Sequence, residues 1–429
     1  MADMKKAFQT AATSLVLILI VAVGARLAFA WDQTRKIPPG VLGIVPFQNE
    51  TGNIAYSLAQ GKGFSSVFRA DTGPTAWLTP VYPLLVAAIF KVFGIFTQRA
   101  FFAAVFLNIL FSSAACVPIF FTGKRVSGLG VASGAAWLWA LFPSAIMMPF
   151  EWIWDTSLSA LLAATLLWAT LALAESERLR DWCGYGLLWG FALMTNPSLG
   201  SLLPFLLGWA AYRARGTRKM RWKRAAIALG VAILCCVPWT IRNYTAFHRF
   251  IPLRANLPFE LWLGNNDIFD EQARNGKKVI TRFEEARRYA QLSETAFMQE
   301  KWDLAISFMR SHPDLELQLT GRRFVGFWMG TDSPLKNFLE TDSFLIKGIL
   351  LCSLVTAAGA LLGMVILFAR RVASALPLAA YPAVFPCLYY LTHADLRYRH
   401  AIDPVILLLT AIAAGALVEL RVKRPRSPL

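Results

Sequence analysis

The sequence predicts an all-α polytopic membrane protein. Of its 429 residues, 56% are hydrophobic and only 16% are charged, whereas soluble domains are about 45–50% apolar and about 25% charged. Apolar runs of roughly 20 residues, the length that crosses a bilayer as a helix, recur along the chain. We therefore expect a bundle of about ten transmembrane helices rather than a soluble globular protein.

The ten predicted crossings are defined by these apolar runs. The fifth and sixth are short, so they could form a tilted or broken pair. At the end of the first crossing, Ala28-Phe29-Ala30 resembles a signal-peptide cleavage site. The apolar run before it is too long for a signal peptide, however, and Arg26 interrupts the approach to the site. We expect a retained first crossing, and place the ten near residues 10–30, 99–121, 128–148, 156–174, 183–196, 198–212, 225–241, 344–368, 373–392 and 402–419.

The net charge of +17 indicates membrane topology rather than nucleic-acid binding. With a cytoplasmic N-terminus, the inner segments hold 19 of the 43 basic residues but 5 of the 26 acidic ones, so the inner side carries +14 and the outer side +3. This is the positive-inside pattern, with both termini cytoplasmic. We expect a multi-pass cell membrane protein, in a bacterial inner membrane, that contacts membrane lipids and no nucleic acid.

The predicted crossings divide the chain into three parts. Residues 1–241 form a transmembrane module whose first outer loop is 31–98. Residues 242–343 form a small, mostly helical extracytoplasmic domain with a short extended start, in which a helix over Phe283–Arg310 ends at Ser311-His312-Pro313. Residues 344–429 add the C-terminal transmembrane helices and a basic cytoplasmic tail.

The first outer loop contains the most informative stretch, residues 47–83. Asn49 can cap a helix that starts at Glu50, where the helix dipole favours a carboxylate, and Asn53 shares the face of Glu50. Glycines 61 and 63 end this helix. A stiff turn that includes Thr75 then leads to Tyr82 and the apolar residues 81–93, which are too few to span and predict a juxtamembrane helix at the outer interface.

The polar residues that could carry chemistry concentrate at the outer membrane face, while the middles of the crossings are almost free of charge. Transporters usually carry ionisable groups at the bilayer midplane, whereas an enzyme for a lipid-linked substrate needs its polar site at the interface. The residues in question are Glu50, Asp71, Arg242, Asn243, Arg254, Glu260, Arg397 and Arg399.

Two further groups of residues receive a structural interpretation. Glu151 and Asp155 lie between tryptophans, and we interpret them as solvated acids in an aromatic interfacial belt. The four histidines, all on the outer side, lack the spacing of a metal site on one helix. We assign no metal ligands and no certain cofactor, although a divalent cation stays possible because ligands can meet in space.

Five stretches in this order resemble the GT-C membrane glycosyltransferases, and within them the bacterial family 39-like enzymes, which are similar to protein O-mannosyltransferases and to the lipid A aminoarabinose transferase. The resemblance covers nearly the whole chain. It rests on ETGNIAYSLAQGKGFS, GPTAWLTPVYPLLVAAIFKVFG, VPWTIRNYTAFHRFIPLRANLPFELWLGNN, HPDLELQLTGRRFVGFW and RYRHAIDP. It implies a GT-C-like transmembrane bundle with juxtamembrane helices.

The resemblance also implies an activity. A polyprenyl-phosphate sugar would be the donor, used on the extracytoplasmic face, and an acid in the first outer loop would be catalytic. Glu50 matches that position, although many relatives have Asp or an Asp-Glu pair where this chain has Gln48 and Asn49. The expected enzyme is a glycosyltransferase of the inverting type, whose acceptor is a lipid, a glycan or a protein.

Elementary chemistry assigns roles to the candidate residues. Inverting transfer needs a base for the acceptor proton, and Glu50 can serve. The leaving lipid phosphate needs cations beside it, and a guanidinium fork suits phosphate oxygens; the alternative for such arginines is snorkelling at the interface. The candidate substrate-binding residues are Arg397, Arg399, Arg242, Tyr398, His400, Asn53, Thr75 and Tyr82.

Two other functions compete with this one. A glycan ligase or polymerase would use a lipid-diphosphate-linked glycan, paired arginines in a large outer loop and no essential first-loop acid. A lipid flippase or transporter would need a polar path through the membrane, which the uncharged crossings do not offer.

Overall fold

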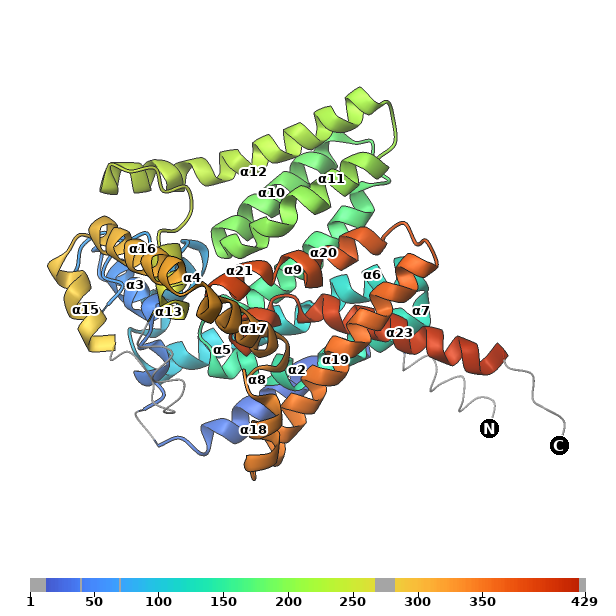
Figure 1. Cartoon of the computed structure of the whole chain (residues 1–429), viewed down its shortest axis with the longest axis horizontal. Coiled ribbons are helices and arrows are strands. Elements are labelled where there is room, and N and C mark those ends of the chain that lie inside the picture. Colours follow the sequence, from blue (N-terminus) through green and yellow to red (C-terminus); the bar gives the residue numbers. More distant parts are fainter. Residues whose placement is uncertain (1–12, 39–40, 69–70, 267–281, 424–429) are drawn as a thin grey trace.

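A computed structural model describes residues 13–38, 41–68, 71–266 and 282–423 of the chain. Within these residues the ordered backbone is helical, and strand-like pairing is confined to an isolated bridge between Ser65 and Pro74. Figure 1 shows long helices packed side by side into one bundle, with shorter helices gathered at one end. The predicted all-α polytopic fold is confirmed.

Six helices among the described residues are both long and apolar enough to cross a membrane. They are α2 (Leu15–Thr34), the consecutive α5 (Gln98–Ala114) and α6 (Cys116–Ser127), α9 (Thr156–Leu173), α12 (Arg218–Phe247), α19 (Phe344–Ala369) and α23 (Asp403–Lys423). A seventh crossing is available if α7 (Leu129–Leu141) and α8 (Pro143–Glu151), bent by 42°, count together.

The other predicted crossings correspond to shorter helices. These are α10 (Leu179–Thr195), α11 (Leu203–Arg213) after the 3-10 helix η2 (Pro197–Leu202), α20 (Ala375–Val384) and α21 (Cys387–Leu391). The fifth and sixth crossings are thus separate helices that meet at η2, in line with the alternative of a broken pair. The number of crossings, ten, stays a prediction because several of these helices are too short to span alone.

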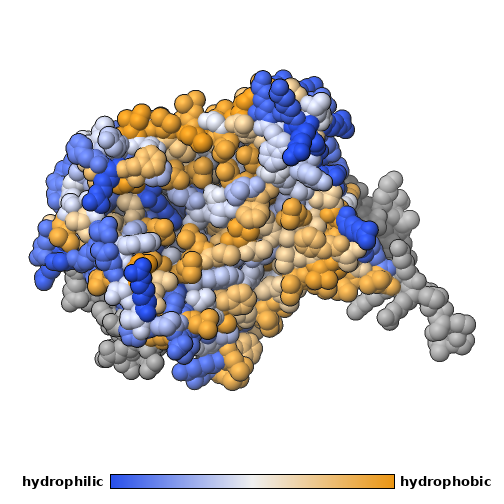
Figure 2. Space-filling model, turned by 45° about the horizontal axis from the view of Figure 1, so that its top comes forward, coloured by the Kyte–Doolittle hydropathy of each residue, from blue (hydrophilic) through white to orange (hydrophobic). Residues whose placement is uncertain are grey.

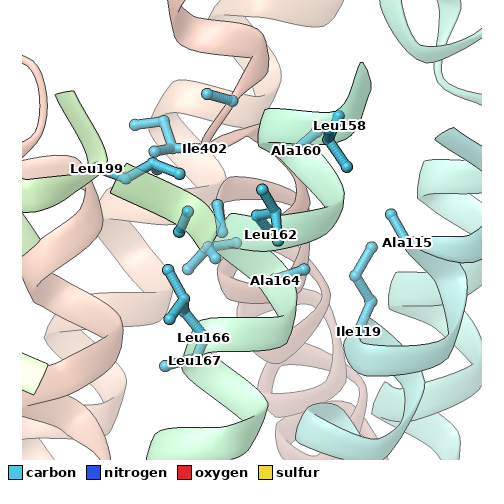
Figure 3. Packing of buried hydrophobic residues seen from close by; sticks show 14 of the residues in the cluster. Ala115, Ile119, Leu158, Ala160, Leu162, Ala164, Leu166, Leu167, Leu199 and Ile402 are labelled. Atoms are coloured by element: carbon cyan, nitrogen blue, oxygen red, sulfur yellow. The ribbon is translucent and has the colours of Figure 1, made fainter. Parts of the chain in front are cut away.

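Helix α9 is the centre of the bundle. Of its most apolar stretch, 72% of the residues are buried inside the protein, so it reads as a helix surrounded by others. Figure 3 shows Leu162 and Leu166 of α9 among Leu199 and Ile402. Small residues such as Ala163, fully buried, let neighbouring helices approach closely, which is the main source of packing energy where lipid replaces water.

Arg26 explains how a charge is tolerated inside the first crossing. Its guanidinium is 1% exposed and donates hydrogen bonds to the Ser112 hydroxyl at 2.9 Å and to the carbonyls of Ala22, Ala140 and Trp139 at 2.8, 3.1 and 3.3 Å. A buried charge is stable only when its donors are satisfied in this way. Arg26 therefore ties α2 to α5 and α7.

The predicted outer loops contain the helices α3 (Glu50–Ala59), α13 (Leu257–Gly264), α15 (Arg282–Gln291), α16 (Glu294–Ser311), α17 (Pro313–Met329) and α18 (Pro334–Glu340). The first four gather at one end of the bundle, whereas α17 lies nearer its middle and α18 lies beside α19 (Figure 1). The predicted helix over Phe283–Arg310 is in fact two helices, because Ser293 caps a new start by accepting the Ala296 N–H. The predicted juxtamembrane helix is present as α4 (Val81–Phe93).

The surface follows the same polarity. Figure 2 shows hydrophilic residues at the two ends of the visible face and a largely hydrophobic surface between them. Apolar side chains are exposed on the long helices, for example Ile233 and Leu234 of α12 and Val355 and Leu361 of α19. Such an apolar surface suits lipid rather than water.

Candidate active site

A cavity of about 310 Å³ lies where the outer-loop helices meet the bundle. Segments that are far apart in the sequence surround it: the start of α3, the turn after α8, the segment around α13, and the chain between α21 and α22 (Leu396–His400). Its polar lining consists of Glu50, Asp155, Thr156, Ser159, Asn196, Arg254, Asn256, Glu260, Glu285, Tyr389, Thr392, His393, Arg397 and Tyr398. Among the candidate residues, the cavity brings together Glu50, Arg397 and Tyr398.

Glu50 reaches the cavity because α3 begins there. The Asn49 side chain accepts the Gly52 N–H at 2.9 Å and caps the helix, as predicted. Gly52 is required at this start, since a Cβ on it would lie 2.0 Å from the carbonyl oxygen of Phe47. Glu50 is partly buried and sits in the first turn, where the helix dipole stabilises a carboxylate.

The interpretation of Asp155 as a solvated belt residue is wrong. Asp155 lines the cavity and accepts a hydrogen bond from the Ser159 hydroxyl at 2.8 Å. Burial raises the pKa of Asp155, while Ser159 and the charges of Arg254 and Arg397 partly oppose that rise. The only sequence signal for a site role of Asp155 is its position directly before a predicted crossing. An acid that merely lies in an aromatic interfacial belt has the same position, so the sequence alone does not distinguish the two.

Arg397 stands in an aromatic frame. Its guanidinium lies 4.7 Å from the ring centre of Trp152, 5.3 Å from that of Trp154 and 4.8 Å from that of Tyr398. Burial disfavours its charge, but Tyr398, Asp395, Glu260 and Glu50 favour it and keep the pKa of Arg397 above its ordinary value. Among the described residues, no carboxylate lies within 4 Å of this guanidinium, and its Nε has no hydrogen-bond partner.

Arg254 supplies a second guanidinium to the cavity. Its Nη2 donates to the Ser198 hydroxyl at 3.3 Å, and its charge acts on Asp155. The sequence places Arg254 among the polar residues of the outer membrane face, but Arg254 is not one of the candidate binding residues predicted from it. Only the fold reveals its place, because the segment before α13 crosses back over the ends of α9 and η2.

A group of polar side chains in contact on one wall was also missed. Glu260 of α13 accepts from the Asn256 amide at 2.8 Å and lies 3.4 Å from Nδ1 of His393, while Nε2 of His393 lies 2.8 Å from the Tyr398 hydroxyl. Glu260 was recognised as an outer-face polar residue, and His393 only as one of four histidines. No sequence spacing connects the two, which are more than 130 positions apart.

Two candidates near Arg397 lie outside the cavity. Arg399 is fully buried and pairs with Asp403 at 2.8 Å, and it donates to the Thr356 hydroxyl at 2.6 Å and to the Trp328 carbonyl. His400 is fully buried with its ring 5.2 Å from that of Trp139. Both side chains fix the outer end of α23 to its neighbours.

The remaining candidates hold the first outer loop in place. Arg242 donates to the carbonyls of Thr75 and Phe64 at 2.7 and 2.5 Å, and Asn53 donates to the Val67 carbonyl at 2.9 Å. Thr75 is fully buried. Tyr82, also buried, donates to Asn108 at 2.8 Å in the helix core.

The cavity presents acids and bases rather than a grouped metal site. In the described ranges, no three His, Cys, Asp or Glu side chains are arranged to hold a metal ion. Arg254 and Arg397 are the cations that this part of the chain offers to an anionic ligand. Carboxylates and guanidinium groups in one partly desolvated cavity can accept a proton and stabilise a developing anion.

Comparison with known proteins agrees with this architecture. Residues 77–241, less than half of the chain, match the family model described as dolichyl-phosphate-mannose-protein mannosyltransferase. Among curated protein sequences, none matches the chain significantly.

Structures of an archaeal protein are among the solved structures with a similar fold. One is the oligosaccharyltransferase AglB from Archaeoglobus fulgidus in complex with an inhibitory peptide and a dolichol-phosphate, with TM-score 0.54, 13% identity, 97% of this chain and 52% of that chain covered. Another is the Archaeoglobus fulgidus oligosaccharyltransferase in complex with Zn and sulfate, with TM-score 0.52, 15% identity and coverage of 95% and 49%. The chain thus spans about half the length of these structures. The expected resemblance to the GT-C superfamily is confirmed at the level of fold.

Proposed function

On the premise of this GT-C fold, we propose that the protein is a membrane glycosyltransferase that moves a sugar from a polyprenyl-phosphate donor to an acceptor at the outer face of the membrane. The observation that carries the proposal is that Glu50 and Arg397, from loops nearly 350 residues apart, line one cavity at the end of the bundle. One side chain suits proton acceptance and the other suits phosphate.

The proposed reaction uses these two side chains at opposite ends of one displacement. Glu50 takes the proton of the acceptor hydroxyl or amide as that group attacks the anomeric carbon, and the bond from this carbon to the phosphate oxygen breaks. The electron pair goes to the lipid phosphate, whose growing negative charge Arg397 stabilises through its free N–H groups. Arg254 is a second cation within the same cavity.

The size of the cavity favours a small transferred group. Its volume of about 310 Å³ lies at the lower end of ligand pockets, about 300–1,000 Å³. A single sugar next to a phosphate suits this volume better than a preassembled glycan. The competing ligase has one observation in its favour, the two arginines, which would also suit a lipid diphosphate.

The test is transfer by the purified full-length protein in lipid nanodiscs, with a panel of synthetic polyprenyl-phosphate sugars and the matching diphosphate glycans as donors. We expect turnover with a monophosphate donor and a loss of about a hundred- to ten-thousand-fold in kcat for Glu50→Gln, the usual effect of removing a general base. Glu50→Asp should keep part of the activity.

Asp71→Asn is the matched control for the charge change. Asp71 is an exposed acid of the same outer loop, outside the cavity, with a weak surface pair to Lys62 at 3.5 Å. The Asp71→Asn variant should therefore transfer sugar at the wild-type rate. Near-wild-type turnover of Glu50→Gln would refute the assigned base, and turnover with diphosphate donors alone would favour the ligase.

A further inference from the structure

One wall of the cavity carries a row of neighbouring polar side chains that leads to Arg397, in which Glu260 and His393 are in electrostatic contact rather than hydrogen-bonded. Asn256 donates to Glu260 at 2.8 Å, Glu260 lies 3.4 Å from Nδ1 of His393, Nε2 of His393 lies 2.8 Å from the Tyr398 hydroxyl, and Nη2 of Arg397 donates to that hydroxyl at 2.9 Å. All five residues line the cavity. The row begins at Asn256, directly before α13, and ends on α22.

The order of donors fixes where the protons lie. A guanidinium can only donate, so the Tyr398 oxygen accepts from Arg397 and its own proton is directed to the nearest acceptor, Nε2 of His393. Nε2 is then unprotonated. A neutral His393 carries its proton on Nδ1, which faces the Glu260 carboxylate.

The surrounding structure holds this wall rigidly. Gly264 at the end of α13 lets the Thr392 carbonyl approach so closely that a Cβ would lie 1.8 Å from its oxygen. Arg323, 5% exposed, donates to the Gly264 carbonyl at 2.6 Å and to the Leu391 carbonyl at 3.2 Å. Tyr398 stacks on Tyr389 with ring centres 4.6 Å apart. The spacing between Glu260 and His393 is therefore set by backbone contacts on both sides.

We propose that Glu260, His393 and Tyr398 are positioning residues that aim Arg397 at the phosphate of the lipid donor, and that neutral His393 is the state competent for donor binding. This rests on the proposed function, because it takes the phosphate to bind at Arg397. The Tyr398 oxygen holds one of the five N–H groups of the guanidinium, and Nε–H is buried, so the remaining Nη N–H groups are the part left for a ligand.

Protonation of His393 reverses the direction of the hydrogen bond between His393 and Tyr398. Nε2–H would then donate to the Tyr398 oxygen, the Tyr398 hydroxyl would lose its acceptor and have to turn away, and a second positive charge would stand next to the guanidinium. The charged and titratable groups that face His393 are Glu260 from α13 and Asp395, Arg397 and Tyr398 from its own segment. Burial lowers the pKa of His393, so the change falls on the acid side of its ordinary value of 6.5.

Binding of a short-chain polyprenyl methyl phosphate diester to the full-length protein in nanodiscs tests this directly. The diester has one negative charge throughout, whereas a phosphate monoester would itself titrate near pH 6. We expect wild-type affinity to fall by about tenfold between pH 7.5 and pH 5, the effect of one charge-assisted hydrogen bond.

Three variants separate the steps. Tyr398→Phe removes the oxygen that orients Arg397 and should bind about tenfold more weakly at pH 7.5, with little pH dependence. His393→Gln cannot gain charge, so its affinity should be the same at pH 5 as at pH 7.5, whatever its value at pH 7.5. Tyr244→Phe, an exposed tyrosine of α12, is the control and should change nothing.

The possible failures are distinguishable. If His393→Gln weakens at low pH as the wild type does, or Tyr398→Phe binds normally, the positioning role of this row is refuted while the phosphate site stands. If the wild type binds no diester, or Arg397→Ala binds it as well as the wild type, the phosphate assignment in the proposed function fails as well. Thermal unfolding of each variant excludes misfolding as the cause.

Discussion

At the scale of single residues, Arg397 and Arg399 show how two nearby arginines acquire different roles. Arg397 faces the cavity and contacts aromatic rings, with no carboxylate of the described residues within 4 Å. Arg399 is fully buried and paired with Asp403. Because a helix turns by about 100° per residue, a two-residue step sends them to opposite sides of α22.

Arg397→Ala should weaken donor use while the protein stays folded. Losing a charge-assisted bond to phosphate costs about 2–3 kcal/mol, roughly 30- to 150-fold in donor affinity. Donor KM in the nanodisc transfer assay measures it. Arg249→Ala, an exposed arginine of the same outer face, serves as the control. An unchanged donor KM in Arg397→Ala would make this residue an interfacial anchor only.

Arg399→Ala should instead destabilise the fold. It leaves the Asp403 carboxylate buried at 1% exposure without its charge partner, and breaking a buried pair costs about 3–5 kcal/mol. The apolar double variant Arg399→Met with Asp403→Leu should recover most of that loss. Thermal unfolding in detergent is the measurement. Arg370→Ala, which breaks the exposed pair with Glu419, should cost about 1 kcal/mol or less, and an equal effect of the two single variants would contradict the prediction.

At the scale of elements, the turn before Trp77 is held by groups from the outer helices. Glu294 at the start of α16, 5% exposed, accepts from the Thr75 hydroxyl at 2.5 Å, the Ala76 N–H at 2.7 Å and the Tyr289 hydroxyl at 2.6 Å. Ala255 N–H donates to the Ala76 carbonyl at 2.7 Å. Since Trp77 lines the cavity, α16 supports the cavity wall without entering it.

Glu294→Ala should therefore lower both stability and donor affinity. It leaves the Ala76 N–H and two hydroxyl groups without their acceptor, at about 1–3 kcal/mol for each buried group left unsatisfied. Glu300→Ala on the same helix breaks the partly exposed pair with Arg288 and a weak contact with Lys301 at 3.9 Å, and should cost about 1 kcal/mol or less. The measurements are the midpoint of thermal unfolding and the donor KM of the two variants. Equal midpoints for Glu294→Ala and Glu300→Ala would refute the role of Glu294 in holding the turn before Trp77.

The acid-side behaviour of Glu294 provides a second measurement. Burial raises the pKa of Glu294 above its ordinary value of 4.5, although Thr75, Tyr289, the Ala76 N–H and Arg242 oppose the rise. The folded state then holds this proton more tightly than the unfolded state, so the contribution of Glu294 to stability declines as pH rises from about 4.5 to its folded pKa. Glu294→Gln should remove that segment of the curve of unfolding free energy against pH.

At the scale of the whole molecule, charge and shape agree on an orientation. Helices α3, α13, α15 and α16 lie at one end of the bundle, and α12 begins at the other (Figure 1). Its first residues belong to the basic segment 213–224, which holds seven arginines and lysines. By the positive-inside rule we expect this segment to be cytoplasmic, which would place the cavity on the extracytoplasmic side.

Reporter fusions test this orientation. A fusion after Arg215 should behave as cytoplasmic and one near Asn266 as external, because α12 carries the chain across the membrane between them. An alkaline phosphatase and fluorescent protein pair reports the two sides. The reverse pattern would overturn the placement of the cavity and the counting of crossings together.

The sequence by itself determined the all-α membrane fold, the Asn49-capped helix that begins at Glu50 and the short helix over residues 81–93. These features are local: apolar run length, a cap and its glycine terminator act within a few residues of each other. The break at Leu292-Ser293 was missed because helical composition continued across it, and only the Ser293 cap marks it.

Tertiary structure alone decided which outer-face residues share a cavity. Asp155, Arg254, Glu260 and His393 join Glu50 and Arg397 there, whereas Arg242 supports the first loop and Arg399 and His400 are buried in the bundle. The physical reason is that sequence fixes the depth of a polar residue in the membrane but not the face it turns to. That face is set by helix rotation and by long-range contacts, such as the approach of Gly264 to Thr392, that no local pattern encodes.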